Sequence, residues 1–294
     1  MSMVQYEEIE ARSAINRVEG MPFRWSLNPY QGCVHGCHYC YARRYHGFRE
    51  LDAGKDFSSV IFVKTNIERV LRNELRRPSW ARETVSIGTA TDPYQPIEGR
   101  YRLTRKCLQA FADHQNPVSV VTKGTLALRD RDILAALSNG PGCTVCFSLT
   151  TLDRDLWCRL EPGTPPPRQR LSVMRRLVEA GVHAGVFLAP VIPGLTDDRQ
   201  NLEAVVRAAA ENGARFLGAQ LLYLKPGTRE HFLGFLERGY PDLLKEYRRL
   251  YPGPYAPKRF QEDVKSAVRD MKLALSFEDH ARPGNVLRQL TLGV

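Results

Sequence analysis

Short β-branched runs alternate along this chain with segments of helical periodicity, and this alternation restricts the fold more than any other feature. The β-branched runs lie at 84–88, 118–122, 144–149, 182–188 and 216–222. The helical segments, which repeat apolar residues every three or four positions, lie at 131–137, 170–180 and 197–210. Strand, helix, strand at this spacing predicts parallel βαβ units in an α/β fold.

A further strand near 23–28 brings the number of units to about six, fewer than a closed eight-stranded barrel needs. Asp197 is expected to cap the helix that follows it, and Gly181 stands where the preceding helix should end. From residue 224 the chain changes to charged helical segments, interrupted by a proline-rich stretch at 251–257. We therefore expect an N-terminal segment (1–22), a barrel-like domain (23–223) and a helical C-terminal extension covering it (224–294).

The composition indicates a basic protein that does not cross a membrane. The 42 Lys and Arg residues outnumber the 32 Asp and Glu residues, for a net charge of +10, which favours a polyanionic partner such as nucleic acid. Arg43, Arg44 and Arg49 are expected near the mouth of an active site, where a phosphate backbone would need them.

No run in the sequence approaches the roughly 18 apolar residues of a membrane helix. The N-terminus lacks an apolar signal core, so we expect the protein in the reducing cytoplasm. We also expect it to be a monomer.

Three cysteines in one short run, Cys33-Val-His-Gly-Cys37-His-Tyr-Cys40, carry the strongest chemical signal. Three thiolates at the spacing C-x₃-C-x₂-C can converge on one soft metal centre, and Gly36 lets the backbone turn around it. Structural zinc sites take four protein ligands, and ordinary four-iron clusters take four thiolates. Three cysteines therefore leave one iron of a [4Fe-4S] cluster open to bind a substrate, which predicts an enzyme.

The same run leaves a second interpretation open. His35 or His38 would supply a fourth ligand and make a structural Cys₃His zinc site. No second ligand pair follows at zinc-finger spacing, which weakens that interpretation. A zinc-bearing, non-catalytic nucleic-acid-binding module nevertheless remains the alternative from another class of protein.

With Tyr39 before its last cysteine, the motif resembles that of the radical S-adenosylmethionine (SAM) superfamily. The wider phrases Asn28-Pro-Tyr-Gln-Gly-Cys33 and Cys40-Tyr-Ala-Arg43 resemble the branch that contains spore photoproduct lyase, a DNA-repair enzyme. The resemblance implies a partial (β/α)6 TIM-like barrel, a [4Fe-4S] cluster on Cys33, Cys37 and Cys40, and bound S-adenosyl-L-methionine. It implies reductive cleavage of SAM to a 5′-deoxyadenosyl radical, with flavodoxin or ferredoxin as electron donor. It also implies a DNA photoproduct or related lesion as the substrate.

Residues at the carboxyl ends of barrel strands are the candidates for binding SAM. Thr89, Thr91 and Asp92 stand in the segment 88–98, which resembles the T-D-P-Y-Q-P-x-E phrase of the same branch. Their oxygens can accept hydrogen bonds from the SAM amino group. Lys123 ends the third strand, and the resemblance implies that it pairs with the SAM carboxylate. Tyr39 is also expected beside the cofactors.

Three further strand ends complete the predicted site. Ser148 is expected to bond the ribose or methionine part of SAM, and Cys146, on the same face of its strand, is a candidate hydrogen-atom donor. The small residues Ala189 and Val191 suit the face of adenine. Tyr223 is a candidate radical relay or stacking group.

Glu161 and Arg170 are expected to form an ion pair that fixes the loop between them.

One departure from spore photoproduct lyase limits the prediction of the reaction. That enzyme carries a hydrogen-donating cysteine at the end of its second strand, whereas residues 88–92 here read Gly-Thr-Ala-Thr-Asp. Either Cys146 or Tyr223 replaces that donor, or the substrate differs. Radical modification of RNA or of a small molecule is therefore the alternative within enzymes.

Overall fold

The larger sheet of the computed structural model, which describes residues 4–21 and 23–280, has seven strands in the order β10-β9-β8-β7-β6-β3-β2. The strands from β3 to β10 are parallel, and only the edge strand β2 is antiparallel to its neighbour. Their bounds are β2 Asn16–Arg17, β3 Trp25–Leu27, β6 Val85–Ile87, β7 Val118–Thr122, β8 Cys143–Leu149, β9 His183–Val191 and β10 Leu217–Leu221. The predicted parallel α/β architecture, a partial TIM-like barrel, is confirmed.

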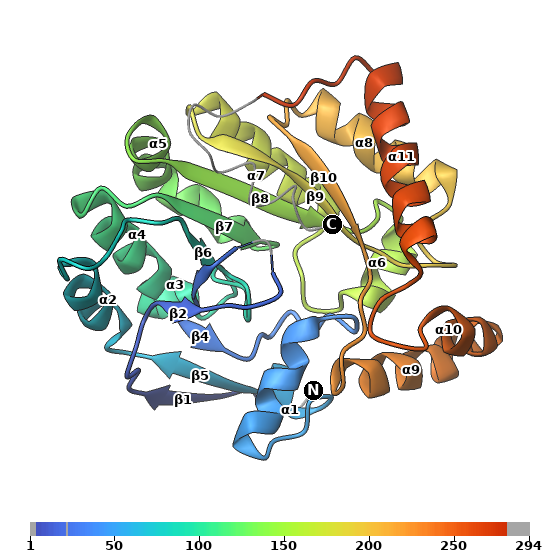
Figure 1. Ribbon diagram of the computed structural model, residues 1–294, viewed down its shortest axis with the longest axis horizontal. Helices are drawn as coiled ribbons and strands as arrows, with labels where there is room; N and C mark the ends of the chain where they lie inside the picture. The colour runs from blue at the N-terminus through green and yellow to red at the C-terminus, as the bar shows by residue number, and fades with distance from the viewer. Residues whose placement is uncertain (1–3, 22, 281–294) are drawn as a thin grey trace.

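Helices cover the outer side of this sheet (Figure 1). All seven residues of β8 are buried, as expected for a central strand with both faces covered. The helices between the strands are α2 Ile67–Leu75, α3 Glu98–Tyr101, α4 Leu103–Asp113, α5 Arg131–Asn139, α6 Arg154–Leu160, α7 Pro167–Glu179 and α8 Arg199–Glu211. Short 3-10 helices lie at η1 Tyr41–Arg49 and η2 Thr125–Asp130.

A second sheet of three strands, which the sequence analysis did not predict, lies beside the first (Figure 1). In it β1 (Gln5–Ile9) pairs in parallel with β5 (Val60–Lys64), and β4 (Tyr30–Gln31) pairs antiparallel to β5. The short helix α1 (Asp56–Ser59) leads into β5. The segment that carries the cysteines follows directly after β4 of this sheet.

Two helix boundaries test the predicted caps. Gly181 follows α7 with a positive φ of 85°, as predicted for a residue that ends a helix. The cap of α8 is Asp198, whose side chain accepts a hydrogen bond from the Asn201 backbone N–H at 2.9 Å. The prediction that Asp197 caps this helix is wrong, because its carboxylate instead accepts a hydrogen bond from the Gly194 N–H at 2.7 Å.

The C-terminal region is helical, as predicted. Helix α9 (Thr228–Gly239) is followed by η3 (Pro241–Leu243), α10 (Leu244–Leu250) and α11 (Lys258–Ala274), which packs on α8 and β10 (Figure 1). No helix within the described residues is long and apolar enough to cross a bilayer. The expected division at residues 22/23 and 223/224 stays a prediction, and residues 1–3, 22 and 281–294 of the expected terminal segments lie outside the described residues.

Candidate functional site

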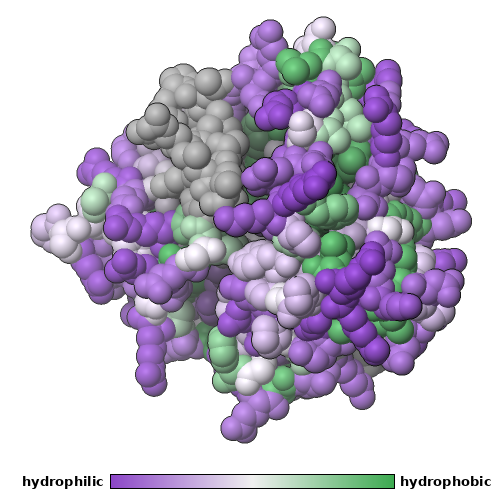
Figure 2. Space-filling model, turned by 45° about the vertical axis from the view of Figure 1, so that its right-hand side comes forward, coloured by the Kyte–Doolittle hydropathy of each residue, from purple (hydrophilic) through white to green (hydrophobic). Residues whose placement is uncertain are grey.

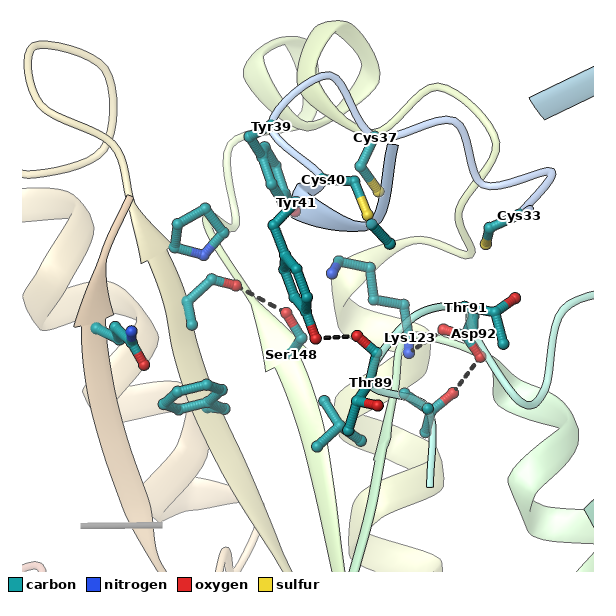
Figure 3. A pocket seen from close by; sticks show the side chains of 18 of the residues that line it. Cys33, Cys37, Tyr39, Cys40, Tyr41, Thr89, Thr91, Asp92, Lys123 and Ser148 are labelled. Atoms are coloured by element: carbon teal, nitrogen blue, oxygen red, sulfur yellow. Dashed lines mark hydrogen bonds between the residues drawn. The ribbon is translucent and has the colours of Figure 1, made fainter. Parts of the chain in front are cut away.

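The three cysteines lie on one loop above the carboxyl ends of the strands (Figure 3). Cys33 and Cys37 are buried, Cys40 is partly buried, and all three line the same pocket. Gly36 turns the loop with a positive φ of 62°. Burial is the main cause that raises the pKa of each thiol, and for Cys37 it raises the pKa to about 12. Among the described residues no three His, Cys, Asp or Glu side chains are placed to hold a single metal ion.

Side chains of the T-D-P-Y-Q-P-x-E phrase hold this loop from the β6 side. The carbonyl oxygen of Gly32 accepts hydrogen bonds from the Thr91 hydroxyl at 2.6 Å and the Gln95 amide at 3.1 Å. The Gln95 amide oxygen in turn accepts from the Val34 N–H at 3.1 Å. The two phrases that the sequence analysis singled out separately therefore form one hydrogen-bonded unit.

Arg43 holds the loop from the other side. Its guanidinium donates to the carbonyl oxygens of Gly36, Cys37, Ala53 and Gly54 at 2.6, 2.9, 3.1 and 2.7 Å. The side chain is 1% exposed. The prediction that Arg43 lies at the mouth of the site is therefore wrong: its N–H groups donate to four carbonyl groups, of which those of Gly36 and Cys37 are buried, and it braces the cysteine loop instead.

The loop after α6 also packs directly on the cysteines. The His38 N–H donates to the Leu160 carbonyl at 3.0 Å, and the Gly163 N–H donates to the His35 carbonyl at 3.0 Å. A β-carbon at Gly163 would lie 2.3 Å from the Val34 carbonyl oxygen, so only glycine fits there.

The predicted ion pair in this loop is confirmed. The Arg170 guanidinium donates to Glu161, whose carboxylate also accepts from the Tyr39 hydroxyl, and both charged groups are buried. Although burial of Glu161 opposes ionisation, the positive charges of Arg170 and Lys123 lower its pKa to about 2. Tyr39, a predicted SAM contact, thus lines the pocket while its hydroxyl points to this pair.

Asp92 and Thr91 are engaged by the chain itself. The Asp92 carboxylate accepts from the Thr122 hydroxyl at 2.6 Å and from the N–H groups of Lys123 and Tyr94 at 2.7 and 2.9 Å, and it lies 3.3 Å from His35 Nδ1. Although burial opposes its ionisation, these partners, His35 foremost, lower its pKa to about 2. Thr91 is committed to Gly32, as described above. Of the three predicted oxygen acceptors, the geometry leaves Thr89 most open to a ligand, because its hydroxyl accepts a single hydrogen bond, from Asn28.

Lys123 places a positive charge inside the pocket. Its side chain extends from the end of β7 toward the cysteine loop (Figure 3), and its ammonium lies 5.4 Å from the centre of the Tyr39 ring. Burial alone would lower the pKa of Lys123, but nearby Cys37 and Glu161 raise it above its usual value. The pocket therefore presents a stable cation to an anionic ligand.

The ends of β8, β9 and β10 form the opposite wall of the pocket. Ser148 and Ala189 line it and are joined by a 2.7 Å hydrogen bond from the serine hydroxyl to the alanine carbonyl. Tyr223 lines it at the end of β10. The other two predicted residues, Cys146 and Val191, are buried but are not among the lining side chains.

Several residues that line the pocket were not predicted from the sequence. Tyr41 follows the last cysteine and donates from its hydroxyl to the Thr89 carbonyl, and Phe187 and Gln220 project from β9 and β10. Alternation along β9 could have identified Phe187, because it is two residues before Ala189. The position of Tyr41 depends on the conformation of η1 and has no comparable local signal.

Comparisons with known proteins identify the family of the chain. Residues 27–206 match the Radical SAM superfamily. A protein of Mycobacterium tuberculosis described as uncharacterized is 40% identical over 284 residues, which cover 95% of this chain and 84% of that protein. A Pseudomonas phage M6 protein, a radical SAM Nalpha-GlyT isomerase, is 29% identical over 188 residues, 63% of this chain and 37% of that protein.

Among solved structures, a spore photoproduct lyase mutant with bound AdoMet and dinucleoside spore photoproduct superposes with a TM-score of 0.70. It is 17% identical and the match covers 92% of this chain and 79% of that one, a likeness that shows a shared fold. The chain belongs to the radical SAM superfamily, whose members use a [4Fe-4S] cluster and S-adenosylmethionine.

Proposed function

We propose that Cys33, Cys37 and Cys40 hold the [4Fe-4S] cluster and that the pocket beneath them binds SAM. The observation that carries this proposal is that three thiols from one loop line a pocket that also contains the cation of Lys123. Thiols are the ligands that iron–sulfur clusters take, so the donor set fits the group. When bound, the cluster and SAM together supply a 5′-deoxyadenosyl radical that abstracts hydrogen from a substrate.

Four side chains of the pocket are assigned to SAM by their chemistry. Lys123 pairs with the carboxylate, and Thr89 accepts from the amino group, for which its oxygen has a free lone pair. Ser148 retains acceptor capacity toward the ribose or methionine part, while Ala189 offers a small apolar contact to adenine. Asp92 acts on the site through His35 and the Lys123 backbone, and is therefore a positioning residue in this proposal.

We further propose a DNA photoproduct or related nucleic-acid lesion as the substrate, with flavodoxin or ferredoxin as reductant and a cytoplasmic monomer as the working form. The net charge of +10 and the fold shared with spore photoproduct lyase support this choice. Cys146 and Tyr223 remain the candidate hydrogen-atom donors. Tyr223 has the better access, because it lines the pocket and Cys146 does not.

The phage relative favours a second candidate function. Its description as an isomerase indicates that a related chain rearranges its substrate instead of splitting it. Radical modification of RNA or of a small molecule belongs to the same class of alternatives. Anaerobic turnover with ultraviolet-irradiated DNA, unirradiated DNA, RNA and small nucleosides distinguishes these candidates: repair requires that only the irradiated DNA stimulates turnover.

The radical SAM assignment is tested by replacing one proposed ligand. We expect Cys37→Ala, purified and reconstituted without oxygen, to lose the cluster and to form no 5′-deoxyadenosine, because two thiolates do not retain a four-iron cluster. Cys158→Ala is the matched control, since Cys158 is exposed and is not among the residues that line the pocket. Normal iron content and SAM cleavage in Cys37→Ala, or a single zinc per chain in the wild type, would refute the proposal.

A further inference from the structure

Three tyrosines gather at one edge of the pocket. Tyr223 lines the pocket, and its ring stacks on that of Tyr255 with 5.7 Å between centroids and 23° between planes. The backbones of these two residues also form an isolated antiparallel bridge, which fixes their rings relative to each other. Tyr45 contributes from η1 and interacts electrostatically with Tyr223. We call Tyr45, Tyr223 and Tyr255, with the two cations described next, the tyrosine edge.

Two positive charges lie over these rings. The Arg44 guanidinium is 5.8 Å from the centre of the Tyr45 ring, and the Lys225 ammonium is 6.0 Å from the centre of the Tyr223 ring. Within the described residues neither cation forms an ion pair, whereas Arg72, Arg105, Arg129 and Arg170 all do. Arg44 and Lys225 therefore carry charge that no ion pair among the described residues neutralises, and both act on Tyr223, which lines the pocket.

The tyrosine edge also keeps an aromatic surface exposed. Tyr255 is 48% exposed, although a large ring normally packs away from water. Within the part of the chain that the structure describes, no hydrogen bond from the Tyr223 or Tyr255 hydroxyl is present to explain these positions. The face of the molecule in Figure 2 is mostly hydrophilic, with hydrophobic residues in smaller areas between. The tyrosine edge itself combines an exposed aromatic ring with two cations, which distinguishes it from an apolar docking groove.

We propose that the tyrosine edge binds an unpaired nucleotide next to the one that enters the pocket. A base would stack on the free face of Tyr255, and Arg44 and Lys225 would contact the adjoining phosphates. This inference rests on the proposed function and specifies the strand state of its substrate. Bases inside a duplex have no free face to offer, so the edge selects single-stranded or locally opened nucleic acid.

The test compares binding of labelled single-stranded DNA, duplex DNA of the same sequence and single-stranded RNA to the anaerobically reconstituted protein. We expect the single strand to bind more tightly than the duplex by fluorescence anisotropy. Tyr255→Ala should weaken single-strand binding about tenfold, while Tyr255→Phe, which keeps the ring, should restore it. Lys225→Ala should weaken binding and reduce the slope of log affinity against log salt by about 0.7.

Matched controls come from exposed residues elsewhere. Tyr6→Ala removes a tyrosine of 36% exposure on β1, and Lys245→Ala removes an exposed lysine on α10, and neither should change affinity. The inference is overturned if the duplex binds as tightly as the single strand, or if Tyr255→Ala binds like the wild type. Iron content and SAM cleavage of the wild type are measured in parallel. The absence of iron and of SAM cleavage would refute the proposed function. Normal cleavage together with unchanged binding by Tyr255→Ala would refute only the proposal for the tyrosine edge.

Discussion

Glu161 is 2% exposed and Arg170 is fully buried, so neither charge has access to water as an alternative partner. Arg170 also donates to the Ser148 carbonyl at 3.0 Å and the Pro165 carbonyl at 2.8 Å. The pair therefore connects the strand that carries Ser148 with the loop that packs on the cysteines. A change in either partner should affect both stability and the site.

We expect Glu161→Gln to lower the free energy of unfolding by about 3–5 kcal/mol, because it leaves a buried guanidinium without its counter-charge. Urea unfolding followed by circular dichroism measures the loss. Glu203→Gln is the control, since Glu203 pairs with Arg207 on the surface of α8 at 40% side-chain exposure and should change stability by under about 1 kcal/mol. Equal effects of the two substitutions would contradict this account.

The same carboxylate predicts a pH dependence. Because the pKa of Glu161 is about 2 in the folded chain and near 4.5 when unperturbed, its stabilisation is complete above pH 4.5 and is lost as pH falls toward 2. The difference in unfolding free energy between wild type and Glu161→Gln should therefore shrink between pH 5 and pH 3. A constant difference across this range would show that Glu161 is not held ionised by Arg170.

Residue roles were predictable where they depend on local spacing and not where they depend on distant partners. Spacing alone identified the three cysteines, and the charge signs of Glu161 and Arg170 were enough to predict their pairing. The role of Arg43 was not predictable, because it requires residues 53 and 54 to fold back onto the cysteine loop. Apart from the Tyr94 N–H, the donors around Asp92 come from residues 122 and 123 at the end of β7 and from His35 of the cysteine loop, and only the tertiary structure brings them together.

Helix α9 contacts the cysteine loop from the C-terminal region. His231 Nε2 lies 3.0 Å from His38 Nδ1, and the two rings stack with 5.2 Å between centroids. Phe235, one turn further along α9, stacks on His38 at 4.4 Å, and the Thr228 hydroxyl donates to the Cys40 carbonyl at 3.2 Å. A region expected only to cover the barrel thus contacts the loop that presents the thiols.

These contacts predict graded effects of two substitutions at one position. We expect His231→Phe to lower the free energy of unfolding by about 1 kcal/mol through loss of the hydrogen bond, and His231→Ala to lower it further through loss of the ring contact as well. Both should alter the electron paramagnetic resonance spectrum of the reduced cluster, with the larger change for alanine. His114→Ala, at the end of α4, should leave that spectrum unchanged.

At the scale of the whole molecule, the six parallel strands were predictable from short runs of largely apolar residues, which are fully buried in β6 and β8 and nearly so in β7. The three-stranded sheet was missed for a physical reason. Its strand β1 reads Gln-Tyr-Glu-Glu-Ile and is largely exposed, so it carries no clear alternation, and β4 has only two residues. Such strands are defined by their partner, β5, rather than by their own composition.

The arrangement of the site around one pocket predicts where cofactor binding changes the dynamics. Hydrogen exchange should slow on cofactor loading at residues 33–40, 88–92 and 121–123, which line the pocket. Exchange in β1 and α10 should not change, because neither contributes to the lining. Slowing spread evenly over the chain would contradict a site confined to the strand ends.

The cysteine loop receives its shape from the Thr91, Gln95 and Arg43 hydrogen bonds, none of which involves a sulfur atom. If an oxidant removes the iron–sulfur cluster, these hydrogen bonds should consequently keep the loop in the conformation that receives a new cluster. Reassembly of the cluster would then require little rearrangement of the backbone. Oxidative damage by air would therefore be reversible and need not lead to degradation of the polypeptide.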